Sequence, residues 1–308
     1  MLKYLIIGMG VQGNKRKQYI KKSNFLSVDI TKNADFKNIE DVPLDKYNAV
    51  IICVPDKQKL SIINYCIKNK KHVLVEKPFP ILNNKKIINL YKQAKRNKVI
   101  LYVAYNHRFE PHFVRAKKII DSKILGKIYS CRLFYGNGTA LLVKKSPWRD
   151  QSLGVVSDLG SHLLDTCNYW FGFKKIKINK SLLLNFENKS FDHAKVLFHK
   201  NKISFEFEMS LCMWRNHFTC DLLAEKGSLH ISSLCKWDTA KLILRKRLFP
   251  SGKPKEKIFK VKSADPTWKS EFSYFNELIK KKDYSNHIRD IMISDAIIEI
   301  KKKQLKYS

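Results

Sequence analysis

A lysine, an aspartate and a histidine in this chain have the types and spacing for acid–base chemistry. Lys77 stands between Glu76 and Pro78, directly after a short apolar run. Asp158 and His162 are four residues apart, so on an α-helix they would share a face one turn apart. An aspartate near a helix N-terminus is favoured as an anion and can stabilise a charged imidazole. His162 is therefore a candidate base, and Lys77 a candidate stabiliser of an alkoxide oxygen.

Structural roles are the alternatives for the same residues. His162 could be a satisfied core histidine, and residues 76–78 could be a solvated loop after a strand. A metal site built from His107, His112, Asp158 and His162 is conceivable, but acid–base chemistry by these side chains needs none, so we expect no metal.

Five further side chains could bind sugar hydroxyls or a phosphate by stacking and by bidentate hydrogen bonds. They are Arg108, Tyr135, Trp148, Arg149 and Asp165. Two of them have structural alternatives, since Arg108 could act at a domain junction and Asp165 could be a solvated or capping carboxylate.

The first glycines of the chain have the spacing G-x-G-x-x-G. An apolar run precedes them and a helical pattern follows, as in the first βα turn of a dinucleotide-binding sheet. In that setting Gly8 permits a tight turn, Gly10 lets the backbone approach a pyrophosphate, and Gly13 lets the helix pack close to the strand. The residues of this predicted phosphate-binding turn are Gly8, Met9, Gly10, Val11, Gln12 and Gly13. The alternative is an ordinary tight turn that binds nothing.

Asp29 is the predicted selector of the cofactor. It lies sixteen residues after Gly13, near the end of the second predicted strand. A carboxylate at this place accepts hydrogen bonds from ribose hydroxyls and repels a 2′-phosphate. We therefore expect NAD rather than NADP.

The order of apolar runs predicts an α/β fold in two domains. Strand and helix signals alternate over the first hundred residues, which is typical of a parallel sheet with helices on both faces. We expect strands at residues 2–7, 25–30, 49–54, 73–75 and 99–104, with helices at 12–22, 57–70 and 83–97.

The later segments alternate apolar and polar residues, as in an antiparallel sheet with one solvated face. We expect strands at 127–135, 176–186, 194–198, 203–209 and 241–245, and closing helices at 267–282 and 288–305. The predicted boundary divides a Rossmann domain at 1–122 from an α+β domain at 123–308.

Composition restricts the partners. The formal net charge is +33 over 308 residues, but the lysines are spread evenly, so we favour a solvated basic surface over a nucleic-acid site. Such a surface would still attract phosphorylated substrates. No run of 18 apolar residues and no signal peptide is visible, which predicts a cytoplasmic protein without a membrane partner.

Taken in order, these motifs resemble those of the Gfo/Idh/MocA oxidoreductases, which are glucose–fructose oxidoreductase-like and inositol dehydrogenase-like enzymes. The similarity rests on the glycine turn, Val54-Pro55-Asp56, EKP at residues 76–78, YNHRFEP at 105–111 and DLGSH at 158–162. It implies a Rossmann domain followed by a domain with an open, mostly antiparallel sheet. It also implies hydride transfer between a nicotinamide and a hydroxyl or keto carbon of a sugar, sugar nucleotide or cyclitol.

The resemblance also implies roles for single residues. Lys77, Asp158 and His162 match the family's active-site lysine, aspartate and histidine; whether Lys77 or His162 transfers the proton stays open. The cofactor pocket is expected to include Val54, Pro55, Glu76, Lys77 and Pro78, and the loop with Trp148 and Arg149 to lie near cofactor or substrate.

The family also suggests a homodimer or homotetramer formed through the open sheets. The apolar stripe in residues 203–214 could serve that contact, unless a helix of the same chain covers it. A short segment between Asp29 and Val50 predicts a trimmed adenosine pocket. The alternative to an enzyme is a non-catalytic nucleotide-sensing or scaffold protein with the same fold.

Overall fold

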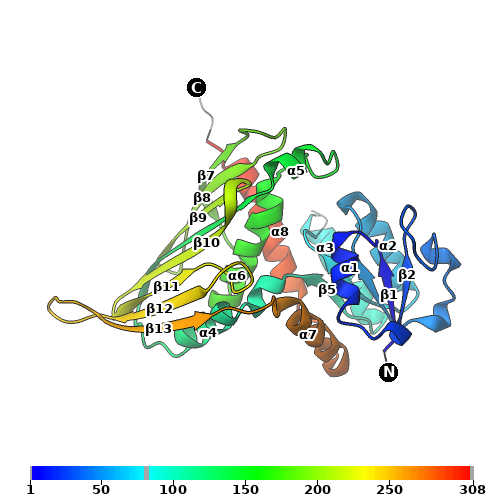
Figure 1. The fold of residues 1–308 in the computed structure, drawn as a ribbon, viewed down its shortest axis with the longest axis horizontal. Coiled ribbons are helices and arrows are strands. Elements are labelled where there is room, and N and C mark those ends of the chain that lie inside the picture. Colours follow the sequence, from blue (N-terminus) through cyan, green and yellow to red (C-terminus); the bar gives the residue numbers. More distant parts are fainter. Residues whose placement is uncertain (1, 80–82, 306–308) are drawn as a thin grey trace. The chain divides into compact units, whose positions relative to one another are not determined.

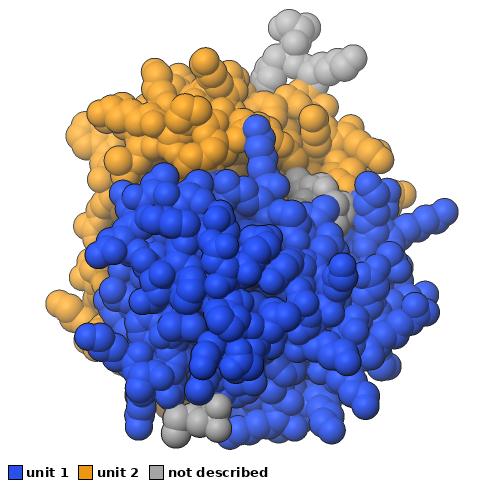
Figure 2. All heavy atoms as spheres, turned by 90° about the vertical axis from the view of Figure 1, so that its right-hand side faces the viewer, with its two compact units in different colours: residues 1–106, 267–294 blue, residues 107–266, 295–308 orange. Residues whose placement is uncertain are grey.

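The computed structural model describes residues 2–79 and 83–305. The chain forms two compact units, coloured separately in Figure 2. The first contains residues 1–106 and 267–294, and the second contains residues 107–266 and 295–308. Within the described residues, no helix is both long enough and apolar enough to cross a membrane.

A five-stranded parallel sheet forms the centre of the first unit (Figure 1). Its strands are β1 (Tyr4–Ile7), β2 (Phe25–Val28), β3 (Ala49–Ile52), β4 (His72–Glu76) and β5 (Leu101–Ala104), in the order β2-β1-β3-β4-β5. The residues of β1, β3 and β5 are buried throughout, because helices cover both faces of the sheet. The predicted α/β fold with a parallel first sheet is confirmed.

The helices of this unit match the predicted ones, except that the first is shorter than expected. They are α1 (Val11–Lys17), α2 (Asp56–Lys68) and α3 (Asn84–Arg96). The first was expected to reach residue 22, but within residues 12–22 only Tyr19 and Ile20 are apolar, so little burial stabilises a longer helix. Two single 3₁₀ turns, Ile39–Asp41 and Leu44–Lys46, lie between β2 and β3.

A helix from late in the sequence completes the first unit. The observed division of the chain therefore differs from the predicted boundary between residues 122 and 123. Helix α7 (Thr267–Lys281) contributes Phe275 and Leu278 to the cluster that contains Tyr4 and Ile51 of the sheet. This apolar sheet face has to be covered, and the seven-residue α1 is too short to do so alone. Helix α8 (His287–Lys302) begins in the first unit and ends in the second.

The second unit is built on an eight-stranded mixed sheet. Its strands are β6 (Ile128–Gly138), β7 (Ile178–Leu184), β8 (His193–Lys200), β9 (Ile203–Ser210), β10 (Cys212–Ala224), β11 (Gly227–Ser232), β12 (Ala240–Lys246) and β13 (Lys255–Val261). Their order is β13-β12-β11-β10-β6-β9-β8-β7, and only the pair β6–β9 is parallel. The expected open, mostly antiparallel sheet is confirmed, although β10, β11 and β13 were not among the predicted strands.

Helices pack on one face of this sheet (Figure 1). They are α4 (Pro111–Asp121), α6 (Ser161–Phe171) and the end of α8, while the short α5 (Ala140–Lys144) follows β6. Phe205 of β9 contacts Phe171 and Phe173, and Ser181 Oγ donates a hydrogen bond to the Ile300 carbonyl of α8.

The apolar stripe of β9 is therefore covered within the chain itself. Phe205, Phe207 and Met209 are fully buried, whereas the intervening Glu206 and Glu208 point to the other face. The β9 part of the predicted stripe is therefore not available for a contact between copies. Trp214, at the other end of the stripe, is fully exposed, so a contact through the open sheet stays a prediction.

Candidate active site

The glycine turn of the first unit has the shape that a phosphate-binding turn requires. Gly8 adopts φ +90°, and an added Cβ there would lie 2.7 Å from the Cys53 carbonyl oxygen. A Cβ on Gly13 would lie 2.0 Å from the Gly8 carbonyl oxygen, so only glycine allows α1 to approach the strand. A Cβ on Gly10, in contrast, would meet no atom within 4 Å. The turn is thus tight on its protein side and open at Gly10, which fits a bound pyrophosphate.

The Asp29 carboxylate is fixed against this turn. Its Oδ2 accepts a hydrogen bond from the Met9 backbone N–H at 2.7 Å, and its Oδ1 accepts from the backbone N–H groups of Thr31 and Lys32 at 2.8 and 2.7 Å. Partial burial opposes ionisation, but the hydrogen bonds from Lys32, Met9 and Thr31 lower the pKa of Asp29 below its ordinary value. A carboxylate whose ionised form is favoured, placed directly after β2, suits a ribose diol.

The segment that carries Lys77 is held from two sides. Glu76, the last residue of β4, accepts hydrogen bonds on Oε1 from Nε and Nη2 of Arg16, both at 2.7 Å. The Pro78 carbonyl oxygen accepts a hydrogen bond from Lys59 Nζ at 2.8 Å. Lys77 itself is half-buried between these two anchors. Val54 and Pro55 lie between the neighbouring β3 and α2, with Pro55 at the N-cap of α2, and both are half-buried.

Sequence reasoning missed both anchors. Arg16 and Lys59 are almost completely buried, and Lys59 also pairs with Asp56 at 2.7 Å. Burial lowers the pKa of Lys59, although the charge of Asp56 opposes this shift. In a chain with 60 lysines and arginines, no local signal distinguishes these two from solvated ones.

The second unit carries the aspartate and histidine. Asp158 lies in a π-helical turn, Val156–Gly160, that leads into α6, and His162 is the second residue of α6. A π turn contains more residues than an α turn, so the expected one-turn stacking of Asp158 above His162 is altered. Arg149 Nη2 lies 3.4 Å from Asp158 Oδ2. Such single π turns are frequent at functional sites.

An aromatic cluster surrounds His162. The ring of His107 stacks on it with a centroid distance of 4.0 Å and an interplanar angle of 19°. Tyr135 lies 5.3 Å from His107 and 6.2 Å from His162, measured between ring centroids. Burial and then the charge of Asp158 raise the pKa of Tyr135. His107 is the residue that sequence reasoning missed here, having considered it only as a metal ligand.

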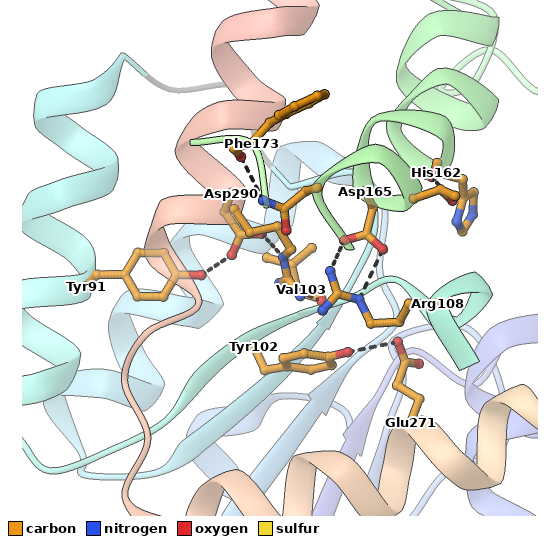
Figure 3. Close-up of polar contacts among 12 residues, drawn as sticks. Tyr91, Tyr102, Val103, Arg108, His162, Asp165, Phe173, Glu271 and Asp290 are labelled. Atoms are coloured by element: carbon orange, nitrogen blue, oxygen red, sulfur yellow. Dashed lines mark hydrogen bonds and ion pairs between the residues drawn. The ribbon is translucent and has the colours of Figure 1, made fainter. Parts of the chain in front are cut away.

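Arg108 and Asp165, two predicted substrate-binding residues, bind each other (Figure 3). Arg108 Nη2 lies 2.5 Å from Asp165 Oδ1, and Nε lies 3.1 Å from Oδ2. Asp165 is 1% exposed, so it is neither a solvated nor a capping carboxylate. The pair connects the 3₁₀ turn Asn106–Phe109 to α6. Trp148, in contrast, is half-exposed in the loop before the π turn.

The site has no grouping typical of a metal centre. Across residues 2–79 and 83–305, no three His, Cys, Asp or Glu side chains are placed to hold one ion. The parallel sheet with its glycine turn instead defines a dinucleotide-binding domain.

Two family models match consecutive parts of the chain. An oxidoreductase family with an NAD-binding Rossmann fold matches residues 12–105, and the GFO/IDH/MocA C-terminal domain matches residues 113–230. The chain belongs to the GFO/IDH/MocA oxidoreductases, as the resemblance indicated. The match also confirms the predicted NAD-type cofactor at the level of the family.

Individual relatives support the same placement. An uncharacterized oxidoreductase of Schizosaccharomyces pombe is 33% identical over 40% of this chain and 33% of its own length. Glucose-6-phosphate 3-dehydrogenase of Bacillus subtilis is 28% identical over 48% of this chain and 42% of its own length. The solved structure of a levoglucosan dehydrogenase with NADH and levoglucosan has a TM-score of 0.80 at 17% identity, covering 98% of both chains, which shows a shared fold. The chain matches less than two thirds of the length of the curated relatives.

Proposed function

We propose that this protein is an NAD-dependent oxidoreductase that transfers a hydride between the nicotinamide and a hydroxyl or keto carbon of a sugar or cyclitol. The observation that carries the proposal is the anchored segment Glu76, Lys77 and Pro78 at the carboxyl end of β4, in a domain whose glycine turn is open at Gly10. Ligands of open parallel sheets bind at this end of the strands.

The cofactor would be held by the first unit. The glycine turn would bind the pyrophosphate through backbone N–H groups, and Asp29 would accept hydrogen bonds from the adenosine ribose. Val54, Pro55, Glu76 and Pro78 would line the nicotinamide end. Bound NAD supplies the hydride acceptor for alcohol oxidation.

The residues of this chain then have to manage a proton and a developing negative charge. The alcohol oxygen loses its proton to a base, for which we propose His162, positioned by the stacked ring of His107. The Lys77 ammonium would stabilise the alkoxide oxygen and could relay the proton. Asp158, near Arg149, would favour the protonated imidazole. Because Arg108 and Asp165 satisfy each other, we propose that they hold α6 rather than bind substrate directly.

The substrate class follows from the family and from charge. Relatives named for glucose 6-phosphate and for myo-inositol suggest a polyhydroxylated ring. The net charge of +33 would favour an anionic form, including a phosphorylated or nucleotide-linked sugar. Tyr135, Trp148 and Arg149 are the proposed contacts. A cytoplasmic location and a homodimer or homotetramer remain predictions, the latter testable by light scattering.

A fluorescence titration with NADH and NADPH tests the proposal. We expect NADH to bind at micromolar concentration and NADPH much more weakly, followed by NAD reduction with at least one member of a panel of sugars, sugar phosphates, nucleotide sugars and inositols. No binding of either nucleotide would contradict the proposal. Binding without turnover of any panel member would favour the non-catalytic nucleotide-sensing alternative.

A further inference from the structure

One buried guanidinium in the first unit contacts two buried carboxylates. Arg16 Nη2 lies 2.7 Å from Glu76 Oε1 and 2.7 Å from Glu271 Oε2. The exposed fractions of Arg16 and Glu271 are 1% and 0%, and that of Glu76 is 8%. The three residues come from α1, β4 and α7. The guanidinium therefore links the helix of the glycine turn, the Glu76–Lys77 strand end and the late helix.

Glu271 is the surplus charge of this cluster. Arg16 supplies one positive charge for two carboxylates, and the other neighbours do not fully neutralise the second negative charge. From β5, the Tyr102 hydroxyl donates to Glu271 Oε1 at 3.3 Å (Figure 3), and from α8 the positive charge of Arg289 acts over a longer range. Burial raises the pKa of Glu271 to about 7; Arg16 opposes this shift and Glu76 reinforces it. The Cys53 thiol also interacts with the cluster, and burial raises its pKa.

The geometry makes Glu76 and Glu271 competitors for one nitrogen. Both carboxylates contact Nη2, while Nε of Arg16 donates only to Glu76. When Glu271 is neutral, Arg16 and Glu76 form a balanced pair. When Glu271 is ionised, it attracts Nη2 and leaves one uncompensated negative charge in the low-dielectric interior. Arg16 follows Gly13 by three residues and Glu76 precedes Lys77 directly, so this change acts on both proposed cofactor-binding segments.

We propose that Glu271 is a positioning residue that acts through Arg16 and Glu76, so that loss of its proton weakens NADH binding. This inference rests on the proposed function. The direction of the effect on NADH affinity follows from charge. NADH carries a negative pyrophosphate, and an added negative charge in the same unit opposes its binding. By linkage, bound NADH would favour the protonated form of Glu271.

The test compares wild type with Glu271→Gln, which keeps the side-chain shape without the charge. The dissociation constant of NADH is measured by fluorescence from about pH 5.5 to about pH 8.5. For wild type we expect binding to weaken by about threefold to tenfold as the pH rises through about 7, since tenfold corresponds to one pKa unit of coupling. For Glu271→Gln we expect a flat profile at the tight, low-pH value.

The matched control is Glu277→Gln on the same helix. Glu277 is exposed and pairs only loosely with Lys281, at 3.5 Å, so this variant should keep the wild-type pH profile. A flat wild-type profile, or a Glu271→Gln profile that still weakens through pH 7, would overturn the inference while leaving the proposed function intact. Absence of NADH binding at every pH would contradict the proposed function itself.

A second readout needs no cofactor. The folded pKa of Glu271 lies above its ordinary value of 4.5, so the stability contributed by the protonated form is present at low pH and is lost as the pH rises towards 7. Urea unfolding of the protein without NADH should show this loss in wild type and Glu277→Gln but not in Glu271→Gln. The same pH dependence in all three proteins would show that Glu271 does not titrate in this range and would overturn the inference.

Discussion

Asp29 Oδ2 accepts a hydrogen bond from the backbone N–H of Met9 at 2.7 Å, which joins the end of β2 to the glycine turn. The contact fixes a carboxylate beside the residue that separates Gly8 from Gly10. Its other oxygen is held by the backbone of the following turn, so the side chain cannot swing away without breaking several hydrogen bonds. The carboxylate that we propose as the selector of the cofactor is therefore held in place before any nucleotide binds.

Asp29→Asn tests this preorganisation. The amide keeps the shape but loses the charge that attracts N–H donors and repels a 2′-phosphate. We expect NADH to bind about tenfold to a hundredfold more weakly, as for loss of a charged hydrogen bond, and NADPH to bind more tightly than in wild type. Fluorescence titrations measure both constants, with the exposed Asp41→Asn as control. Unchanged selectivity would remove Asp29 as the selector.

The two glycines Gly10 and Gly13 should respond differently to alanine. In Gly13→Ala the new Cβ would overlap the Gly8 carbonyl oxygen, so we expect the free energy of unfolding to fall by about 1–3 kcal/mol. In Gly10→Ala the Cβ meets no protein atom, so stability should be unchanged while NADH affinity falls by about tenfold or more. Thermal unfolding and NADH titration of both variants measure this. Full NADH affinity in Gly10→Ala would show that the pyrophosphate does not approach there.

Lys77→Ala tests the proposed alkoxide stabiliser. Loss of a positioned acid–base or electrostatic group lowers turnover by about a hundredfold or more. Because Glu76 and Pro78 remain anchored by Arg16 and Lys59, we expect the NADH dissociation constant to change by no more than about threefold. Steady-state kinetics with the identified substrate and NADH titration separate the two effects. Near wild-type turnover would refute the role, and the exposed Lys95→Ala is the control.

Substitutions of His162 and His107 should affect turnover in different ways. His162→Gln removes the proposed base, and we expect a loss of turnover of about a hundredfold to ten-thousandfold. His107→Phe keeps an aromatic ring against His162, so we expect a smaller loss, about tenfold, with an altered pH–rate profile. Measuring turnover against pH for both variants distinguishes a base from its support. An equal loss in both would mean that His107 itself takes part in proton transfer.

Asp165→Asn tests the buried pair with Arg108. Removing one partner leaves a guanidinium that has lost its counter-charge, so we expect the free energy of unfolding to fall by about 2–4 kcal/mol. The matched control is Asp121→Asn, which removes the exposed Lys117–Asp121 pair and should cost less than about 1 kcal/mol. Urea unfolding measures both. Wild-type stability in Asp165→Asn, together with a raised KM, would support the original prediction that Asp165 binds substrate.

Local patterns in the sequence were enough to predict most strands of the first sheet. Continuous apolar runs such as residues 49–52 are buried on both faces, and glycine spacing marked the turn after β1, because Gly8 and Gly13 have no alternative there. The end of α6 also has a local cause, since Gly172, directly after Phe171, adopts the left-handed conformation that glycine favours. These features depend on near neighbours in the chain.

What the sequence could not reveal depends on distant neighbours. β13 was missed because its residues are mostly exposed and charged, and only its pairing with β12 makes it a strand. The one-turn relation between Asp158 and His162 was altered by a π turn that no residue type announces. The division of the chain differed because α7, far along the sequence, covers a face of the first sheet.

By itself, the sequence determined the alternation of strands and helices in the first sheet, the glycine turn and the residue types available for hydride-transfer chemistry, because these follow from local periodicity and backbone freedom. The tertiary structure alone decided how those residues are held. It buried Arg16 between Glu76 and Glu271, placed Lys59 on the Pro78 carbonyl and stacked His107 on His162. Burial turns an ordinary arginine or lysine into a structural charge, and burial is a property of the packed molecule.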